Sequence, residues 1–186
     1  MLHGSVRVTA LAACLALAAR PARACRIRAT DRDSLHDWPG RLVDSAAAIA
    51  RVRAVGPVGP PPDAPAYRRD GTVAFVVLEW LRPPAGARPD SLAFAGSAAS
   101  GDDYNRGPVP YTFVRRDGAH GDCYAYGHRA GAEYLVLLRP ARGGGGLSPW
   151  WAPLAPVDEQ VRGADDPWVA WVRARARLRA GGHRPA

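Results

Sequence analysis

Residues 117–140, DGAHGDCYAYGHRAGAEYLVLLRP, place a glycine-rich loop that carries a cysteine directly before a run of apolar residues. Cys123 lies between His120 and His128, and residues 133–139 have the composition of a buried strand. A cysteine in such a loop is either a disulfide anchor or a reactive thiol. The interpretation of the whole chain depends on which of these two roles Cys123 has.

The N-terminus has the three parts of a secretory signal peptide. A positively charged start is followed by an apolar core at 8–19 and by a small-x-small cleavage sequence at 22–24. Residues 1–24 are therefore predicted to be removed, which makes Cys25 the first mature residue and the protein secreted or periplasmic. An alternative interpretation takes the residues before Cys14 as a lipoprotein box, with a lipid anchor on that cysteine. No later segment has the length of apolar sequence that a transmembrane helix needs.

Removal of the signal peptide leaves two cysteines, and an even pair in an exported protein indicates one disulfide. We predict the bond Cys25–Cys123, which closes a long loop and contributes about 4–5 kcal/mol in the chain-entropy model. The alternative is a nucleophilic Cys123 paired with His120 or His128. Such a pair requires the imidazole within hydrogen-bonding reach of the sulfur, and closeness in sequence does not show this. We therefore predict no catalytic residue.

The net charge of +8 does not indicate nucleic-acid binding, because of where the charge lies. All 25 basic residues are arginine; three lie in the leader and five in residues 173–186. The remaining 17 arginines lie in residues 25–172, which also hold all 17 carboxylates, so the body of the protein is neutral. A neutral body lacks the basic footprint that binds phosphates.

The possible metal ligands near Cys123 are not spaced as in zinc motifs, which use tight repeated pairs. We predict no metal and no cofactor, and we take His120 and His128 as solvated loop residues. The acidic pair Asp102–Asp103 lies in a glycine-serine loop and is predicted to be solvated. The pair Asp165–Asp166 precedes Pro167 and is predicted to cap a helix.

Hydrophobic periodicity predicts short strands and two helices. A short helix is expected at 42–50 after a turn at 38–40, and a terminal helix is expected from Pro167 to about Arg179. Proline and glycine predict loops at 56–65 and 96–110. Five strands are expected at 49–55, 72–81, 92–95, 111–115 and 133–139.

Five short strands with long loops predict a mainly β fold, namely a small five-stranded OB-like Greek-key barrel with a C-terminal α-helix. Residues 25–172 are expected to form this single domain. After Val172 the arginines recur every second residue and so lie on opposite sides of a helix. Residues 173–186 are therefore predicted to be an arginine-rich, partly disordered tail.

The segments Cys-Tyr-Ala-Tyr-Gly and Gly-Ala-Glu-Tyr-Leu-Val-Leu-Leu, after an N-terminal cysteine, resemble the netrin-like module of the tissue inhibitors of metalloproteinases. The resemblance covers about residues 25–140 and implies an OB barrel in which the later cysteine is bridged to the N-terminal region. The matching residues are Cys25, Cys123, Gly131, Tyr134, Leu135 and Val136.

In that family the N-terminal cysteine chelates the zinc of the protease through its amine and carbonyl. This chain begins Cys25-Arg26-Ile27 and lacks the second cysteine of the family's Cys-x-Cys start. Metalloprotease inhibition through Cys25 is therefore kept as an alternative only.

The functional prediction is a non-enzymatic binding or interaction module whose partner is a protein, peptide or glycan at the cell surface. Aromatic side chains suit such contacts because a flat apolar face carries a polar edge. Packing against the terminal helix is the competing role for them. A thiol- or His-dependent hydrolase that uses Cys123 is the alternative from another class. The candidate ligand-facing residues are Tyr104, Tyr124, Tyr126, His128, Trp150 and Trp151.

Overall fold

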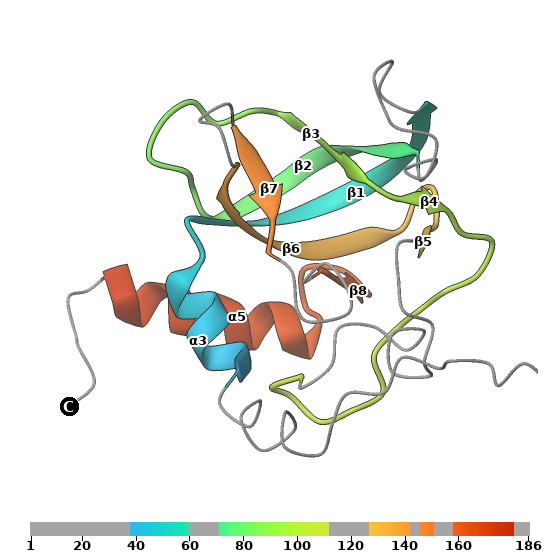
Figure 1. Cartoon of the computed structure of the whole chain (residues 1–186). Coiled ribbons are helices and arrows are strands. Elements are labelled where there is room, and N and C mark those ends of the chain that lie inside the picture. The colour runs from blue at the N-terminus through green and yellow to red at the C-terminus, as the bar shows by residue number, and fades with distance from the viewer. Residues whose placement is uncertain (1–37, 60–70, 112–126, 142–145, 151–157, 181–186) are drawn as a thin grey trace, which may run out of the picture.

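The computed structural model describes residues 38–59, 71–111, 127–141, 146–150 and 158–180 (Figure 1). They form α3 (Trp38–Ser45), β1 (Ala48–Gly59), β2 (Thr72–Arg82), β3 (Ser91–Ala95), β4 (Ser97–Ala98), β5 (Gly127–His128), β6 (Glu133–Pro140), β7 (Leu147–Pro149), β8 (Asp158–Val161) and α5 (Pro167–Ala180). The fold is mainly β, with a six-stranded antiparallel sheet and a C-terminal helix, as the sequence predicted at this level of detail.

β1 and β6 are the centre of the sheet. The strand order is β3-β2-β1-β6-β7, and β8 also pairs with β6. β7 and β8 share one edge of β6: β7 pairs with residues 138–140, and β8 pairs with residues 133–136. The short strands β4 and β5 form a separate parallel pair.

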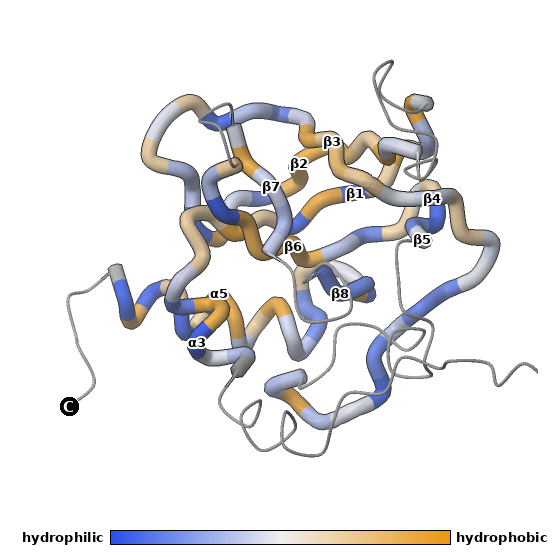
Figure 2. Tube along the Cα trace, viewed as in Figure 1, coloured by the Kyte–Doolittle hydropathy of each residue, from blue (hydrophilic) through white to orange (hydrophobic). Residues whose placement is uncertain are grey.

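Both faces of the sheet are buried, because successive side chains of its central strands enter two hydrophobic clusters in turn. We call these the inner cluster and the helix cluster. Figure 2 shows hydrophobic residues concentrated in β1, β2 and β6. Successive side chains of a strand point to opposite faces, so neighbouring residues enter different clusters. The inner cluster consists of Ala48, Ala50, Val52, Ala54, Val73, Phe75, Phe94, Ala132, Tyr134, Val136 and Leu138.

The helix cluster lies between the other face of the sheet and the two helices, which pack side by side (Figure 1). Fully burying a Val, Leu, Ile or Phe side chain stabilises the folded state by about 1.5–3 kcal/mol, so these contacts fix the helices on the sheet. The cluster consists of Leu42, Val43, Ala46, Ile49, Tyr111, Leu135, Leu137, Val161, Trp168, Val169 and Val172.

α5 begins where the sequence predicted. Asp166 accepts hydrogen bonds from the backbone N–H of Trp168 (2.9 Å) and of Arg162 (3.0 Å), and Pro167 occupies the first helical position. The helix ends at Ala180, which confirms the predicted end near Arg179, and residues 173–180 of the predicted tail are helical. The remaining residues of the predicted tail, 181–186, lie outside the described part of the chain.

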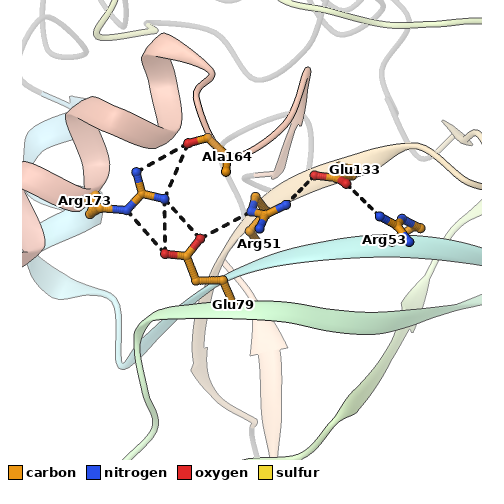
Figure 3. Close-up of polar contacts among 6 residues, drawn as sticks. All are labelled: Arg51, Arg53, Glu79, Glu133, Ala164 and Arg173. Atoms are coloured by element: carbon orange, nitrogen blue, oxygen red, sulfur yellow. Dashed lines mark hydrogen bonds and ion pairs between the residues drawn. The ribbon is translucent and has the colours of Figure 1, made fainter.

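A chain of ion pairs joins α5 to the face of the sheet that carries the helix cluster (Figure 3). Arg173 donates from Nη2 to both carboxylate oxygens of Glu79 at 3.1 Å, and Arg51 donates to Glu79 from its Nε at 3.4 Å. Arg51 and Arg53 also donate to Glu133, at 2.6 and 3.0 Å. These contacts explain why the arginines after Val172 are compatible with a docked helix.

A second set of polar contacts joins α3 to α5 and β2. Arg175 donates to both oxygens of Asp44 at 2.9 Å. Arg82 donates from Nη1 to the carbonyls of Val43 (2.7 Å) and Ala46 (2.8 Å) at the C-terminal end of α3. A cation suits this end of a helix because the last carbonyls lack intrahelical partners.

The predicted helix at 42–50 and turn at 38–40 are wrong in register. The helix spans 38–45, because a proline in the first turn lacks only a donor that would be unpaired there. Residues 48–50 extend β1 instead and pair with β6. The alanines favoured a helix locally, and burial between two strands overrides that preference.

The predicted loop at 56–65 is wrong for residues 56–59, which continue β1. Gly56 and Gly59 have φ of 145° and 87°, and the register with β2 shifts beside each of them. β6 pairs only with residues 48–53 of β1. Pro57 has no N–H to donate, but it lies beyond the part of β1 that bonds to β6, so no hydrogen bond between these two strands is lost.

The strands predicted at 72–81, 92–95 and 133–139 are confirmed within one residue at each end. β4, β5, β7 and β8 were not predicted. Of the strand predicted at 111–115 only Tyr111 is described; it is not in a strand, and its ring stacks on Trp168 at 5.2 Å.

Candidate functional site

Polar residues converge on β8, whose four residues Asp158, Glu159, Gln160 and Val161 are all buried. Asp158 and Gln160 point to one side of the strand, and Glu159 and Val161 point to the other. Three consecutive buried polar side chains require partners, because a buried polar group without a hydrogen bond is costly. Residues from two other segments, 102–105 and 127–129, provide them.

His128 is paired with Asp158 inside the protein, so its assignment as ligand-facing, and as a solvated loop histidine, is wrong. The His128 Nε2 atom lies 2.7 Å from Asp158 Oδ2, and the two side chains are only 1% and 2% exposed. The imidazole packs edge-on against Phe75 (5.0 Å) and Tyr134 (4.9 Å) of the inner cluster. Its backbone carbonyl accepts a hydrogen bond from Ala99, which holds β5 beside β4.

Within the described residues, His128 Nδ1 has no hydrogen-bond partner. An aspartate that holds one ring nitrogen orients an imidazole for chemistry at the other nitrogen in many enzymes. With 1% of its side chain exposed, this imidazole does not reach a substrate in the present conformation. The pair instead joins β5 to β8 across the inner cluster.

Gln160 fixes the segment that carries Tyr104. Its Oε1 accepts the backbone N–H of Asp103 at 2.6 Å, and its Nε2 donates to Asp102 Oδ1 at 2.5 Å. Tyr104 forms an isolated parallel bridge with Gln160. The prediction of a solvated acidic pair is therefore wrong for Asp103, which is buried, whereas Asp102 is exposed and hydrogen-bonded.

Tyr104 lies beside two arginines at the surface. The Arg162 guanidinium carbon is 4.4 Å from the centroid of the Tyr104 ring, within the range of a cation–π contact. Arg129 donates from Nε to Asp102 Oδ1 at 2.7 Å, and its backbone N–H donates to the hydroxyl of Tyr134. We refer to Tyr104, Arg129, Arg162 and Asp102 as the Tyr104 face.

The electrostatics of the Tyr104 face follow from the contacts between its charged groups. Hydrogen bonds from Gln160 and Arg129 keep the pKa of Asp102 below its ordinary value, although burial acts in the opposite direction. The hydrogen bond to Asp102 and its negative charge raise the pKa of Arg129. Both groups are therefore charged at neutral pH, and the face presents two guanidinium groups and one carboxylate around an aromatic ring.

The opposite side of β8 faces the helix cluster. Asn105 donates to Glu159 Oε1 at 3.2 Å, so Glu159, for which the sequence showed no partner, is hydrogen-bonded. Burial raises the pKa of Tyr111, and the nearby carboxylates of Asp166 and Glu159 raise it further. Three acidic and aromatic residues thus meet where α5 begins.

The other candidate residues do not join this site. Trp150 follows β7 and packs against the helix cluster, and Arg139 lies 5.5 Å from its ring centroid. Trp168 is buried. It therefore has the packing role that was the alternative to a ligand-binding groove for the aromatic residues. The following residues that the sequence singled out lie outside the described part of the chain: Cys14, Cys25, His120, Cys123, Tyr124, Tyr126 and Trp151.

The sequence did not predict a role for Arg129, Arg162 or Gln160. The available signal was the polar run 158–160 next to a capped helix, which periodicity alone does not mark as a strand. No group of three metal-ligating side chains occurs among the described residues. Within the same ranges, no helix has the length and apolar character to cross a membrane.

Comparison of the chain with protein-family models, with curated proteins and with solved structures finds no match.

Proposed function

We propose that this protein is a non-enzymatic binding module whose partner contacts the Tyr104 face. The observation that carries the proposal is the stacking of Arg162 on Tyr104, with both side chains partly exposed. Tyrosine and arginine are enriched among the residues that dominate binding energy at interfaces. Gln160 and Asp102 hold the face in place before any ligand arrives, which lowers the entropy lost on binding.

The chemistry of the face favours a partner that bears a carboxylate. Arg129 and Arg162 supply guanidinium groups, which form directed hydrogen bonds with carboxylates. The ring of Tyr104 supplies a flat surface for an apolar group or a sugar. We therefore propose a protein, peptide or glycan partner with an acidic group next to such a surface.

The proposed setting is an exported domain stabilised by the bond Cys25–Cys123, with OB-like, netrin-like architecture. In support of this architecture, four strands lie side by side in the order β6-β1-β2-β3. This is the spatial order of a Greek key, in which a fourth strand returns to the side of the first. Intact mass of the mature protein tests the cleavage after residue 24, the lipid on Cys14 and the disulfide together.

The binding proposal is tested by probing arrays of acidic peptides and of glycans that bear uronic or sialic acid with the full mature chain. Tyr104→Ala and Arg162→Ala are each expected to weaken a genuine signal by about 30-fold, the effect of losing ~2 kcal/mol at a dominant contact. Tyr104→Phe is the matched control, since it keeps the ring and is expected to keep most of the binding. Absence of any signal on the arrays, or signals that both alanine variants retain, contradicts the proposal.

A thiol hydrolase that uses Cys123 with His120 or His128 is the second candidate. The observation in its favour is the His128–Asp158 pair, in which a carboxylate orients an imidazole. A Cys123→Ala variant separates the two candidates. Loss of folding with no activity to lose supports the binding module, whereas intact folding with lost turnover of an ester or peptide substrate supports the enzyme.

A further inference from the structure

The solvent-facing side of α5 is apolar along its middle. Ala170, Ala174 and Leu178 recur every four residues and are exposed, and Leu178 is 66% exposed. Residues at this spacing lie one above another on a helix. Trp171 is half-buried and lies beside the same strip, because it precedes Leu178 by seven residues, or two turns. We call Ala170, Ala174 and Leu178 the outer strip.

Arginines border the outer strip on both sides. Residues two apart point to nearly opposite sides of a helix, so Arg177 lies on one border and Arg175 and Arg179 lie on the other. α5 carries four arginines and no carboxylate, and Arg173 is directed to Glu79 of the sheet. The solvent-facing side of the helix is therefore apolar in the middle and cationic at its borders.

Among the described residues around α3 and α5, positive charge exceeds negative charge. Asp44 is the carboxylate that pairs with Arg175 at 2.9 Å and with Arg179 at 3.5 Å. Burial lowers the pKa of Arg82, the charge of Asp44 raises it and the charge of Arg179 lowers it. Arg175 and Arg179 thus share one carboxylate, and the exposed Arg177 adds a further positive charge.

We propose that the solvent-facing side of α5 docks on the surface of an anionic lipid bilayer, with the helix axis parallel to the membrane plane. Leu178 and the exposed edge of Trp171 enter the boundary between headgroups and acyl chains. Arg177 and Arg179 extend to the lipid phosphates on opposite borders of the strip, with their aliphatic stems along it, while Arg175 keeps its hydrogen bonds to Asp44. This surface is separate from the Tyr104 face and does not depend on its function.

Charge and shape favour a bilayer over a soluble polyanion. A soluble polyanion would pair with the arginines and leave Leu178 in water, with no gain from the apolar strip. An anionic bilayer matches both features, because its phosphates surround an apolar interior. The inner side of the helix buries Val169 and Val172 in the helix cluster, so docking requires no opening of the fold.

The test is co-sedimentation of the full mature chain with vesicles of phosphatidylcholine, alone or mixed with phosphatidylglycerol, at low and at physiological salt. We expect partition onto the mixed vesicles only, weakened by salt. Arg177→Ala is expected to lower the partition coefficient about fivefold, the factor for ~1 kcal/mol per basic residue at an anionic surface. Arg106→Ala is the matched control, because it removes an exposed arginine from residues 99–111 and is expected to leave partition unchanged.

Leu178→Ser distinguishes the bilayer from a polyanion. The proposal predicts that this variant partitions less onto the mixed vesicles and binds heparin as well as the unchanged chain does. Equal partition of Leu178→Ser and the unchanged chain overturns the proposal in favour of a purely electrostatic contact. Binding to neither kind of vesicle, or equal binding to both, overturns it as well. Circular dichroism confirms that each variant remains folded.

Discussion

Replacement of Glu79 by Gln tests whether ion pairs hold α5 on the sheet. Glu79 accepts hydrogen bonds from Arg173 at 3.1 Å to each oxygen and from Arg51 at 3.4 Å (Figure 3). Glutamine has the same shape and keeps one acceptor oxygen, so the change removes the charge with little change in packing. Val169 and Val172 remain buried in the variant, and the effect isolates the electrostatic contact.

The expected loss is about 1–2 kcal/mol of unfolding free energy at neutral pH. A hydrogen bond to a charged group contributes about 1.5–3 kcal/mol when it is well shielded, and exposed pairs contribute about 0.2–1 kcal/mol. The side chains of Glu79 and Arg173 are 33% and 26% exposed, which places this contact between the two cases. Urea unfolding followed by tryptophan fluorescence measures the loss, with Asp90→Asn as an exposed control expected to change stability by less than about 0.5 kcal/mol.

The difference between the unchanged chain and the variant depends on pH. Burial alone would raise the pKa of Glu79, but the hydrogen bonds and charges of Arg173 and Arg51 lower it below its ordinary value of 4.5. A carboxyl with a lowered folded-state pKa contributes stability that is fully present above pH 4.5 and is lost as pH falls through the folded-state pKa. The difference should therefore be constant above about pH 5 and should shrink in acid, where the unchanged chain also loses the charge.

An unchanged urea midpoint for Glu79→Gln at pH 7 would refute this account of how α5 docks. A difference that grows in acid would refute the pH argument separately. Glu133→Gln provides an internal comparison, because Arg51 and Arg53 likewise lower the pKa of Glu133 against the effect of burial. Its loss should follow the same direction with pH.

Two further substitutions test the other polar contacts. His128→Ala breaks the buried His128–Asp158 pair and is expected to cost about 3–5 kcal/mol in urea unfolding. The double variant with Asp158→Asn should cost less than the sum of the single changes, and simple additivity would speak against the pair. Asp166→Ala removes the cap of α5 and is expected to cost about 1–2 kcal/mol and to lower helical circular dichroism, whereas Asp165→Ala, at the exposed neighbouring position, should change little, so equal losses would contradict the capping role.

The parts of the fold that the sequence predicted are those with local causes. The strand at 72–81 is rich in β-branched and aromatic residues, and Tyr134–Leu138 is a continuous apolar run, so composition sufficed for both. Asp166 and Pro167 mark the start of α5 by cap chemistry that acts within one turn. These signals need no knowledge of the rest of the chain.

The parts that the sequence did not predict depend on distant partners. β8 is polar, and its burial depends on His128, Asn105 and the backbone of Asp103. The end of α3 is contacted by Arg82, which donates to the Val43 carbonyl from 39 residues away in sequence. Arg129 and Arg162 reach Tyr104 from separate segments.

The candidate site was therefore found only in part. Tyr104 was chosen for its aromatic ring, and it lies on the proposed face. His128 was chosen for its place in a glycine-rich loop, but pairing with Asp158 and packing on Phe75 draw it into the interior. Side-chain chemistry suggested both residues, and only the three-dimensional contacts separate an accessible residue from a buried one.

The pairing of one edge of β6 with two short strands, β7 and β8, has a consequence for aggregation. The segment Tyr134–Leu138 is apolar, uncharged and free of proline, which is the composition that assembles into cross-β fibrils when its edges are open. In the folded protein β1 occupies one edge of this segment, and β7 and β8 occupy the other in succession. β8 is held largely by polar contacts, so conditions that weaken them would open the edge of the most aggregation-prone strand while β1 remains paired.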